Sequence, residues 1–309
     1  MTVLPNRVTI REVALRDGLQ IEEPISLAAK IELLEAVLAT GVREVEATAF
    51  VSPTKVPALA DAAELAAELP RLRAQFDAEF SALVAGPGGA RRAVAAGIAS
   101  LEYVVSAADG HSRANVGRST AESTALIADI VAIAREAGAS VEVIIATAWD
   151  CPFDGPTQPQ RVVDIVGQAV HSGAERIAIA DTIGTATPRR VADLIALVQP
   201  EADDIALGAH FHNTRGSGLA SAYAAVQSGI TRLDASVGGL GGCPFAPGAS
   251  GNIATEDLVY LLRDSGIDVD VDLSAAIAAA EVARRIVGHD LPSALLRAGD
   301  RKLSENGVN

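Results

Sequence analysis

The chain has 309 residues, of which 49% are hydrophobic and 3% aromatic, so its core must be built mainly from Ala, Val, Ile and Leu. A formal net charge of −14 argues against nucleic acid or an anionic membrane surface as a partner. The only two cysteines, Cys151 and Cys243, exclude a disulfide framework and favour a reducing compartment. No apolar run has membrane-spanning length, and little room precedes the first predicted strand for a signal or transit peptide. A soluble cytoplasmic protein is therefore expected.

Short β-rich runs alternate with longer Ala- and Leu-rich runs of helical periodicity along the whole chain. The predicted strands are Arg7–Val13, Glu44–Thr48, Glu79–Val84, Leu101–Ser106, Ser140–Thr147, Arg176–Asp181, Ile205–His212 and Arg232–Val237. Eight strand-then-helix units predict an α/β fold, a closed parallel (β/α)8 or TIM barrel. An open, doubly wound sheet is the alternative.

The helical runs carry signals for where they begin and end. The clearest runs are Ser26–Thr40, Ser119–Ala137, Gln158–Ser172 and Pro188–Val198. Ser26 and Ser119 are suitable N-caps, and Gly41 and Gly138 are suitable C-terminal stops.

The last part of the chain continues beyond the eighth unit, whose helical run is Asn252–Arg263. Leu273–Val287 predicts an additional helix packed outside the barrel. We therefore expect one domain over residues 1–309, with the barrel at about 7–264 and a C-terminal helical extension at about 265–309.

Polar residues follow several predicted strands. In a (β/α)8 barrel the C-terminal ends of all strands share one face, where active sites form. The residues expected to gather at this mouth are Arg16, Asp17 and Gln20 after the first strand, Glu46 at the second, Asp181 at the sixth, His210 and His212 at the seventh, and Asn252 after the eighth.

His210 and His212 are two residues apart on a predicted strand, so their side chains point the same way. Two such imidazoles can bind one metal ion, and Asp17 and Asn252 complete a set of two nitrogen and two oxygen ligands. Zinc would fit, but the hard oxygen ligands and the open positions favour Mg²⁺ or Mn²⁺. The alternative is a pair of hydrogen-bonded strand histidines without a metal.

Three charged residues at the mouth have both a chemical and a structural interpretation. Arg16 can stabilise a developing oxyanion, or it can form a surface ion pair with Glu12 or Glu22. Glu46 and Asp181 can carry protons or anchor the metal site. Asp181 can instead cap the segment that follows it, which is common at strand-to-helix junctions.

A glycine-rich segment, Gly238–Asn252, contains Cys243 between Gly242 and Pro244. Glycine raises the entropy cost of ordering such a loop and proline removes backbone donors. We expect this thiol to close over a bound substrate; the alternative is a buried structural cysteine.

A second polar segment is expected at the same mouth, after the fourth strand. Its residues His111, Arg113, Asn115 and Arg118 can contact a phosphate-bearing cofactor tail, or they can form a solvated charged loop. Cys151, just past the fifth strand, is interpreted as packing in the wall of the site.

Together these segments resemble the 3-hydroxy-3-methylglutaryl-CoA lyase family of metal-dependent TIM-barrel lyases. The resemblance runs from about Val8 to Leu262 and rests on Glu12–Gln20, Phe50–Pro53, Asn115 with Ser119, Cys151–Phe153, Asp181–Gly184, His210–His212, Gly241–Asn252 and Ala254–Asp257. Arg-Asp and His-x-His are shared with related synthases and aldolases. The Gly-Gly-Cys-Pro loop running into Gly-Asn is specific to the lyase branch.

The resemblance implies an enzyme that cleaves 3-hydroxy-3-methylglutaryl-CoA, or a related 3-hydroxyacyl-CoA, by a retro-Claisen reaction. The products are acetyl-CoA and acetoacetate, or the related ketoacid, as in leucine catabolism and ketone-body formation. A homodimer is expected from the same likeness.

Site residues also follow from the resemblance. The implied ligands of a divalent cation, Mg²⁺ or Mn²⁺, are Asp17, His210, His212 and Asn252. The implied catalytic residues are Arg16, Asp17, Glu46, Asp181, His210 and Cys243. Arg16 would stabilise the enolate oxygen, and Cys243 would protonate the enolate carbon. Gln20 and Asn115 are expected to bind the CoA part of the substrate.

Departures from the family pattern lie beside the expected substrate pocket. Ala14-Leu15 replaces the usual Gly-Pro, Ile21 precedes Glu22 where Asn is usual, Lys55 replaces an aromatic residue, and Asn213 stands where Asp is common. These changes leave the acyl group open, so a branched or longer 3-hydroxyacyl-CoA is an alternative. Further alternatives are a Claisen-type synthase, a pyruvate-class aldolase and a non-catalytic CoA-binding protein.

Overall fold

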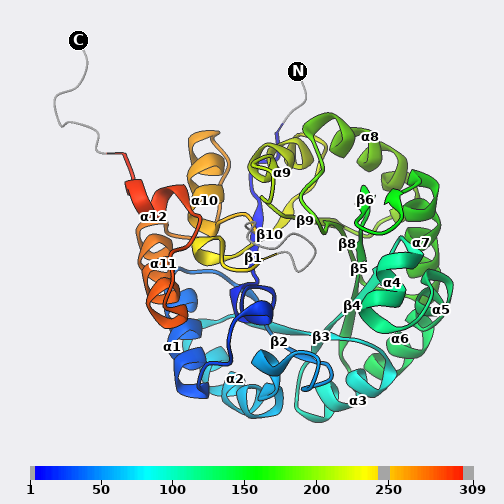
Figure 1. Ribbon diagram of the computed structural model, residues 1–309, viewed down its shortest axis with the longest axis horizontal. Coiled ribbons are helices and arrows are strands. Elements are labelled where there is room, and N and C mark those ends of the chain that lie inside the picture. The colour runs from blue at the N-terminus through cyan, green and yellow to red at the C-terminus, as the bar shows by residue number, and fades with distance from the viewer. Residues whose placement is uncertain (1–3, 243–250, 302–309) are drawn as a thin grey trace.

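Eight parallel strands close into a barrel in the computed structural model, which describes residues 4–242 and 251–301 (Figure 1). The strands are β1 (Thr9–Glu12), β2 (Glu44–Phe50), β3 (Glu79–Val84), β4 (Ser100–Ser106), β5 (Ser140–Ala146), β8 (Arg176–Asp181), β9 (Leu207–Phe211) and β10 (Arg232–Ala235). β1 pairs with both β2 and β10, which closes the sheet. The predicted (β/α)8 barrel is confirmed, and the open-sheet alternative is wrong.

Strand ends differ from the prediction by a few residues. β2 continues to Phe50 because it stays paired with β3 beyond a register shift between Glu46 and Thr48. Glu46 therefore lies within the strand and not at its end. β9 ends at Phe211, so His212 is the first residue after the strand. A register shift of this kind re-aims neighbouring side chains, and it occurs here next to the barrel mouth.

Helices surround the barrel (Figure 1). They are α1 (Leu27–Leu38), α2 (Ala62–Phe76), α3 (Pro87–Ala95), α4 (Asp109–Val116), α5 (Thr120–Ala125), α6 (Ile127–Glu136), α7 (Pro159–Ser172), α8 (Pro188–Val198), α9 (Gly218–Gln227), α10 (Thr255–Asp264), α11 (Leu273–Val287) and α12 (Ala294–Ala298). Both predicted N-caps are confirmed. Ser26 Oγ accepts from the Ala29 amide at 3.2 Å, and Ser119 forms a capping box with Glu122.

The predicted helix Ser119–Ala137 is divided at Leu126 into α5 and α6. The Tyr103 hydroxyl donates to the Ser123 carbonyl, 2.9 Å away, where α5 ends. A side-chain donor that enters the backbone ladder interrupts a helix, which periodicity alone does not reveal.

Short elements complete the fold and shape its loops. A two-stranded hairpin joins β6 (Asp150–Cys151) to β7 (Gly155–Pro156). Single helical turns are η1 (Ala14–Gly18), η2 (Leu19–Ile21), η3 (Pro57–Leu59), η4 (Gln199–Ala202) and η5 (Val237–Gly239). The η1 turn is of the π type, which is often found at functional sites.

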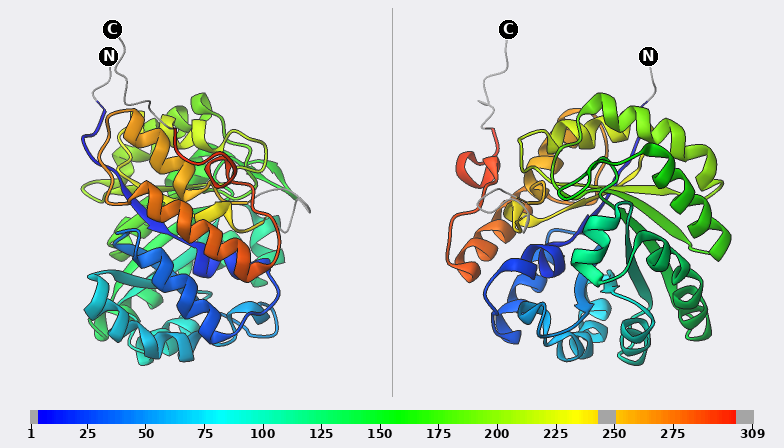
Figure 2. Two further views of the ribbon diagram at one scale, coloured as in Figure 1. Left: turned by 90° about the vertical axis from the view of Figure 1, so that its left-hand side faces the viewer. Right: turned by 45° about the vertical axis from the view of Figure 1, so that its right-hand side comes forward.

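The predicted C-terminal helix has the expected bounds. It is α11, which packs against α1 and α10 outside the barrel (Figure 2). Its N-cap Asp272 accepts from the Ala275 amide at 2.8 Å. Among the helices in the described parts of the chain, none is long and apolar enough to cross a bilayer.

Candidate active site

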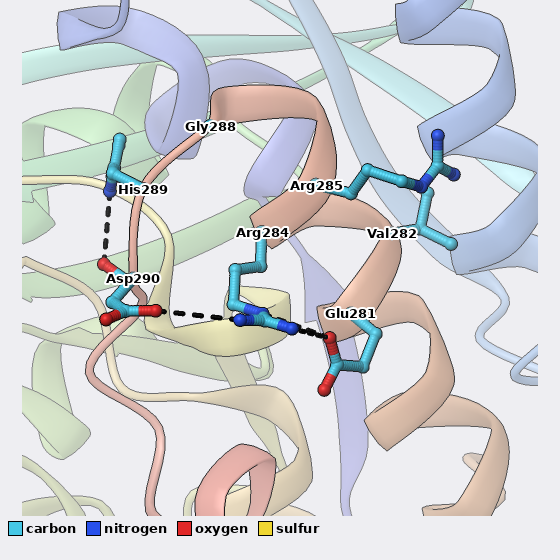
Figure 3. A pocket seen from close by; sticks show the side chains of 7 residues that line it. All are labelled: Glu281, Val282, Arg284, Arg285, Gly288, His289 and Asp290. Carbon is cyan, nitrogen blue, oxygen red and sulfur yellow. Dashed lines mark hydrogen bonds and ion pairs between the residues drawn. The ribbon is translucent and has the colours of Figure 1, made fainter.

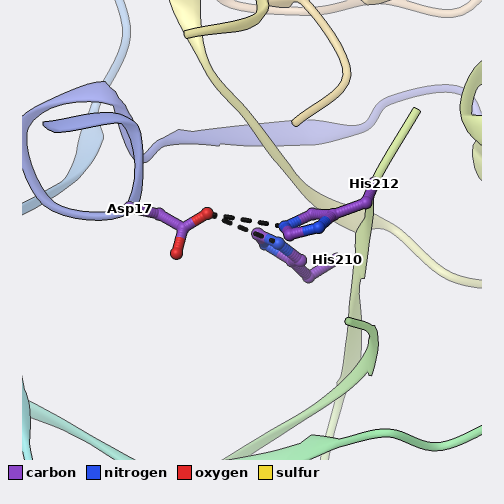
Figure 4. Close-up of side chains that lie close together, drawn as sticks. All are labelled: Asp17, His210 and His212. Carbon is purple, nitrogen blue, oxygen red and sulfur yellow. Dashed lines mark ion pairs between the residues drawn. The ribbon is translucent and has the colours of Figure 1, made fainter. Parts of the chain in front are cut away.

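Three of the four predicted metal ligands meet at the barrel mouth. Asp17 comes from η1, His210 from β9 and His212 from the residue after β9, and their side chains point toward one another (Figure 4). Asp17 Oδ2 lies 3.6 Å from His212 Nε2 and 3.9 Å from His210 Nε2. One donor atom from each residue lies within 4.8 Å of the others. Donors that share one ion at about 2.1 Å are at most about 4.2 Å apart, and both distances from Asp17 to the histidines lie within this limit.

Asn252, the fourth predicted ligand, also lies in this cluster. It is 2% exposed, and its backbone forms an isolated bridge with His212. Its amide nitrogen donates to Asp17 Oδ2 at 2.9 Å and to the Leu240 carbonyl at 3.1 Å. A Cβ at Gly241 would come within 2.8 Å of this nitrogen, so the close approach requires glycine.

The η1 turn carries Arg16 and Asp17, and buried Glu12 holds it in place. Glu12 Oε1 accepts from the amides of Ala14 at 2.9 Å and Val237 at 3.1 Å, and Oε2 accepts from the Thr255 hydroxyl at 2.6 Å. One carboxylate thus joins the start of η1 to the start of η5, which leads into the glycine-rich segment. Burial raises the pKa of Glu12 to about 8, against the opposing effect of these three donors.

Arg16 is 7% exposed and lies between two acids. Its Nη1 is 2.7 Å from Asp17 Oδ1, and its Nε is 2.6 Å from Glu46 Oε1. Glu12 and Glu22, the alternative partners considered from the sequence, are not among the ion-pair partners of Arg16 in the described residues. Within residues 4–242 and 251–301, Arg16 Nη2 forms no hydrogen bond to the protein.

Burial and charge give the acids of the site different protonation properties. Burial alone would raise the pKa of Asp17, but Arg16 and the imidazoles of His212 and His210 hold it well below its ordinary range. Burial raises the pKa of Glu46 well above its ordinary range, although the adjacent Arg16 opposes the shift. Asp17 is therefore ionised, whereas Glu46 can hold a proton.

Asp181 ends β8, as predicted, and it is 2% exposed. Its two carboxylate oxygens accept from the amides of Thr185 at 3.0 Å and Ala186 at 2.8 Å. Burial raises its pKa, while these two amides oppose the shift. These hydrogen bonds are those of the capping interpretation. They fix the turn after β8, which begins at the barrel mouth.

The remaining predicted residues are not part of the cluster of Asp17, His210, His212 and Asn252. Gln20 Oε1 accepts from Arg16 Nη1 at 3.4 Å, so it lies beside the cluster. Asn115 is exposed on α4, which follows β4 at the mouth, and no contact joins it to the cluster in the described residues. Cys151 is buried, and its sulfur accepts from the Phe153 and Asp154 amides. The prediction for Cys243 lies outside the described residues.

Asp234 on β10 was missed by reasoning from the sequence. Its Oδ2 lies 3.1 Å from His210 Nδ1, on the side of the imidazole away from Asp17. Arg11 on β1 donates Nε to Asp234 Oδ1 at 2.9 Å and Nη2 to Oδ2 at 2.7 Å. Burial alone would raise the pKa of Asp234, but Arg11 and His210 hold it well below its ordinary range. The sequence did carry one signal for this pair. Arg11 and Asp234 are charged residues that lie inside predicted strands, where apolar residues are expected.

A surface cavity of about 640 Å³ lies elsewhere, at the C-terminal end of α11 (Figure 3). Within it, Arg284 lies 2.7 Å from Glu281 and 3.6 Å from Asp290. None of the predicted site residues lines it. The residues expected to carry the chemistry therefore lie at the barrel mouth and not in this cavity.

Comparison with known proteins agrees with the fold. The sequence model of the family described as HMGL-like matches residues 7–283. The chain is 42% identical over 300 residues to the (R)-citramalyl-CoA lyase of Chloroflexus aurantiacus, which covers 94% of this chain and 95% of that protein.

Solved structures are similar over nearly the whole chain. The HMG-CoA lyase of Bacillus subtilis has 35% sequence identity and a TM-score of 0.91, and the match covers 96% of this chain and 98% of that one. An HMG-CoA lyase from Acinetobacter baumannii, solved in complex with coenzyme A and 3-methylmalate, has 38% identity and a TM-score of 0.89 over 100% of both chains. The chain therefore belongs to the HMGL-like family, and it is an enzyme of the hydroxymethylglutaryl-CoA lyase type.

Proposed function

We propose that the protein is a divalent-cation-dependent lyase that cleaves a carbon–carbon bond in a short 3-hydroxyacyl-CoA whose acyl group ends in a carboxylate. The observation that carries this proposal is the meeting of Asp17, His210, His212 and Asn252 beside Arg16. The relatives support the substrate class, since one acts on (R)-citramalyl-CoA and another was solved with coenzyme A and a hydroxy-diacid.

The residues of the cluster fit a resident Mg²⁺ or Mn²⁺. An ionised carboxylate and two imidazoles lie at the required separations, and the Asn252 side chain adjoins them. When bound, the cation would lower the pKa of the substrate hydroxyl and so ease its deprotonation. Asp17, His210, His212 and Asn252 are the residues proposed to hold it.

The reaction itself requires the chain to move two protons. The hydroxyl on carbon 3 loses its proton to Asp17, and its electron pair forms a carbonyl as the bond between carbons 2 and 3 breaks. The electrons of that bond pass to the thioester as an enolate, whose oxygen faces Arg16 Nη2. Cys243 then donates a proton to carbon 2, which completes acetyl-CoA.

The other predicted residues would position these groups. Glu46 holds the Arg16 guanidinium, and Asp181 holds the turn after β8. Both contacts favour anchoring over proton transfer for these two acids. Gln20 and Asn115 are proposed to contact the CoA part of the substrate. The homodimer, the cytoplasmic location and the single-domain organisation remain predictions from the sequence.

Citramalyl-CoA and 3-hydroxy-3-methylglutaryl-CoA are the leading substrates because relatives are named for them, and their acyl groups differ by one methylene. In citramalyl-CoA the carboxylate is attached to carbon 3, so cleavage releases pyruvate. In 3-hydroxy-3-methylglutaryl-CoA a methylene separates the carboxylate from carbon 3, so cleavage releases acetoacetate. A pocket distinguishes substrates that differ by one methylene by about 1–3 kcal/mol, or 10- to 200-fold in kcat/KM.

The proposal is tested with a panel of both thioesters and 3-hydroxybutyryl-CoA, which lacks the carboxylate. Acetyl-CoA should form from at least one of the first two, only with added Mg²⁺ or Mn²⁺, and EDTA should abolish it. Binding of every thioester without turnover would identify a CoA-binding protein, and consumption of acetyl-CoA with a ketoacid would identify a synthase.

The role of the thiol is tested with a matched pair of variants. Cys243→Ala should lower kcat by about 100-fold or more and leave Mn²⁺ binding intact. Cys151→Ala removes the other thiol, which is buried and accepts from two backbone amides, and should keep most of the activity. Full activity of Cys243→Ala would disprove the acid role.

A further inference from the structure

Behind His210, a pair of oppositely charged side chains is buried inside the barrel. Asp234 is 4% exposed and Arg11 is 3% exposed. Asp234 Oδ2 contacts His210 Nδ1 at 3.1 Å, while both carboxylate oxygens accept from Arg11. Bidentate contacts of this kind fix the plane of a carboxylate as well as its position.

We propose that the Arg11–Asp234 pair positions His210 and keeps its ring proton on Nδ1, so that Nε2 faces Asp17 with a free lone pair. This inference rests on the proposed function, because the lone pair matters only if His210 binds a cation. Arg11 and Asp234 are thus positioning residues: neither lies among the donor atoms of the cluster.

The tautomer follows from the hydrogen-bonding capacity of each group. Arg11 is a donor that stays protonated, so the carboxylate it holds in two-point contact fits best in its ionised form. An ionised carboxylate can only accept, and Nδ1 of His210 must therefore donate. In a neutral imidazole the proton on Nδ1 leaves Nε2 as the acceptor, which is the form that binds metal ions.

Arg11 is itself held in place from the opposite side of the barrel. Its Nη1 lies 2.8 Å from Glu102 Oε1 on β4 and also contacts Glu142 on β5. Arg232 on β10 forms a two-point contact with Glu142. Since β1 and β5 are four strands apart in an eight-stranded ring, these contacts cross the barrel interior. The guanidinium cannot turn without breaking several buried ion pairs, so it transmits a fixed orientation to Asp234.

The first test reads the tautomer of His210 in the wild-type protein. In metal-free wild-type protein with ¹⁵N-labelled histidine, the neutral His210 ring should give the chemical shifts of the Nδ1–H tautomer. The chain has 5 histidines, so the His210→Gln spectrum suffices for assignment. A neutral His210 in the Nε2–H form would overturn the proposal.

The second test compares Asp234→Asn with Asp61→Asn. The amide introduced by Asp234→Asn would offer its oxygen to Arg11 and its NH₂ to His210, which forces the ring proton to Nε2. Mn²⁺ affinity, measured by electron paramagnetic resonance, should fall about 10- to 100-fold. Asp61→Asn removes a carboxylate from another buried cation, Lys30, away from the cluster, and should leave Mn²⁺ affinity unchanged.

The outcomes separate this inference from the proposed function. If the wild-type protein binds Mn²⁺ and Asp234→Asn binds it equally well, the positioning role is wrong and the proposed function stands. If the wild-type protein binds no Mn²⁺, the metal part of the proposed function fails, whatever the tautomer of His210. Equal losses in Asp234→Asn and Asp61→Asn would assign the effect to stability and overturn the positioning role.

Discussion

Replacing Glu12 by Gln should change how the stability of the fold depends on pH. Glu12 is 1% exposed, and burial raises its pKa from the ordinary 4.5 to about 8. The folded state therefore binds a proton that the unfolded chain has already released in this range. Stability from this group is complete below about pH 4.5 and is lost as the pH rises toward 8.

The size of the effect follows from the two pKa values. Each pH unit between 4.5 and about 8 is worth about 1.4 kcal/mol, so the loss is on the order of 5 kcal/mol. Glutamine keeps an oxygen for the amides of Ala14 and Val237, and its NH₂ can donate to the Thr255 hydroxyl. The variant should thus match the wild type near pH 5 and exceed it in unfolding free energy by several kcal/mol at pH 8.

Urea denaturation at a series of pH values from 5 to 8.5 measures this difference. Titrating groups that do not interact with Glu12 shift both proteins alike, so the quantity to compare is the unfolding free energy of the variant minus that of the wild type. Glu23→Gln removes the same charge from an exposed side chain and is the matched control. A Glu12→Gln difference that stays constant with pH would refute the argument that burial raises the pKa of this carboxyl.

Three further outcomes are expected. Arg16→Lys should lower kcat by about 100- to 1,000-fold with Mn²⁺ affinity retained, because a lysine cannot contact Asp17, Glu46 and an oxyanion at once; steady-state kinetics and metal titration check this. Asp181→Ala should lower the unfolding free energy by about 1–2 kcal/mol in a urea titration, since two amides lose their acceptor. Gly184→Ala should lower both the melting temperature and the Mn²⁺ affinity, because at φ +63° the new Cβ would lie 3.0 Å from the carbonyl of His212, a proposed ligand. Gly229→Ala is the control: its φ is +98° and its Cβ would lie in open space, so it should lower only the melting temperature.

Periodicity and strand ends predicted the barrel because those signals are local. A run such as Leu273–Val287 contains its own apolar stripe, and the structure gives it those bounds. The His-x-His spacing and the strand that carries it were also local, so His210 and His212 could be expected to point the same way. Convergence of Asp17 on them required only the general rule that all strands of a barrel end at one face.

What the sequence did not reveal depends on contacts across the barrel. Asp234 and Arg11 are 223 positions apart, and neither follows the end of a strand. The division of the predicted helix at Leu126 depends on the Tyr103 hydroxyl from another strand. The π-type turn at Ala14–Gly18 likewise depends on Glu12 binding two distant segments at once. Such features need register and side-chain geometry, which a single sequence does not contain.

The interior of this barrel differs from the aliphatic layers that usually fill one. Arg11, Arg232, Glu102, Glu142 and Asp234 are all buried there. Buried ion pairs seldom stabilise a fold more than well-packed apolar residues of the same size would, so stability alone is a poor explanation for them. These ion pairs instead fix the orientation of side chains, because each charged group holds the plane or rotamer of the next. At the mouth this chain of contacts ends on the His210 imidazole, one of the groups whose direction matters to chemistry. We therefore infer that the strands set the geometry of the site from below, which leaves the loops above free to differ with the acyl group.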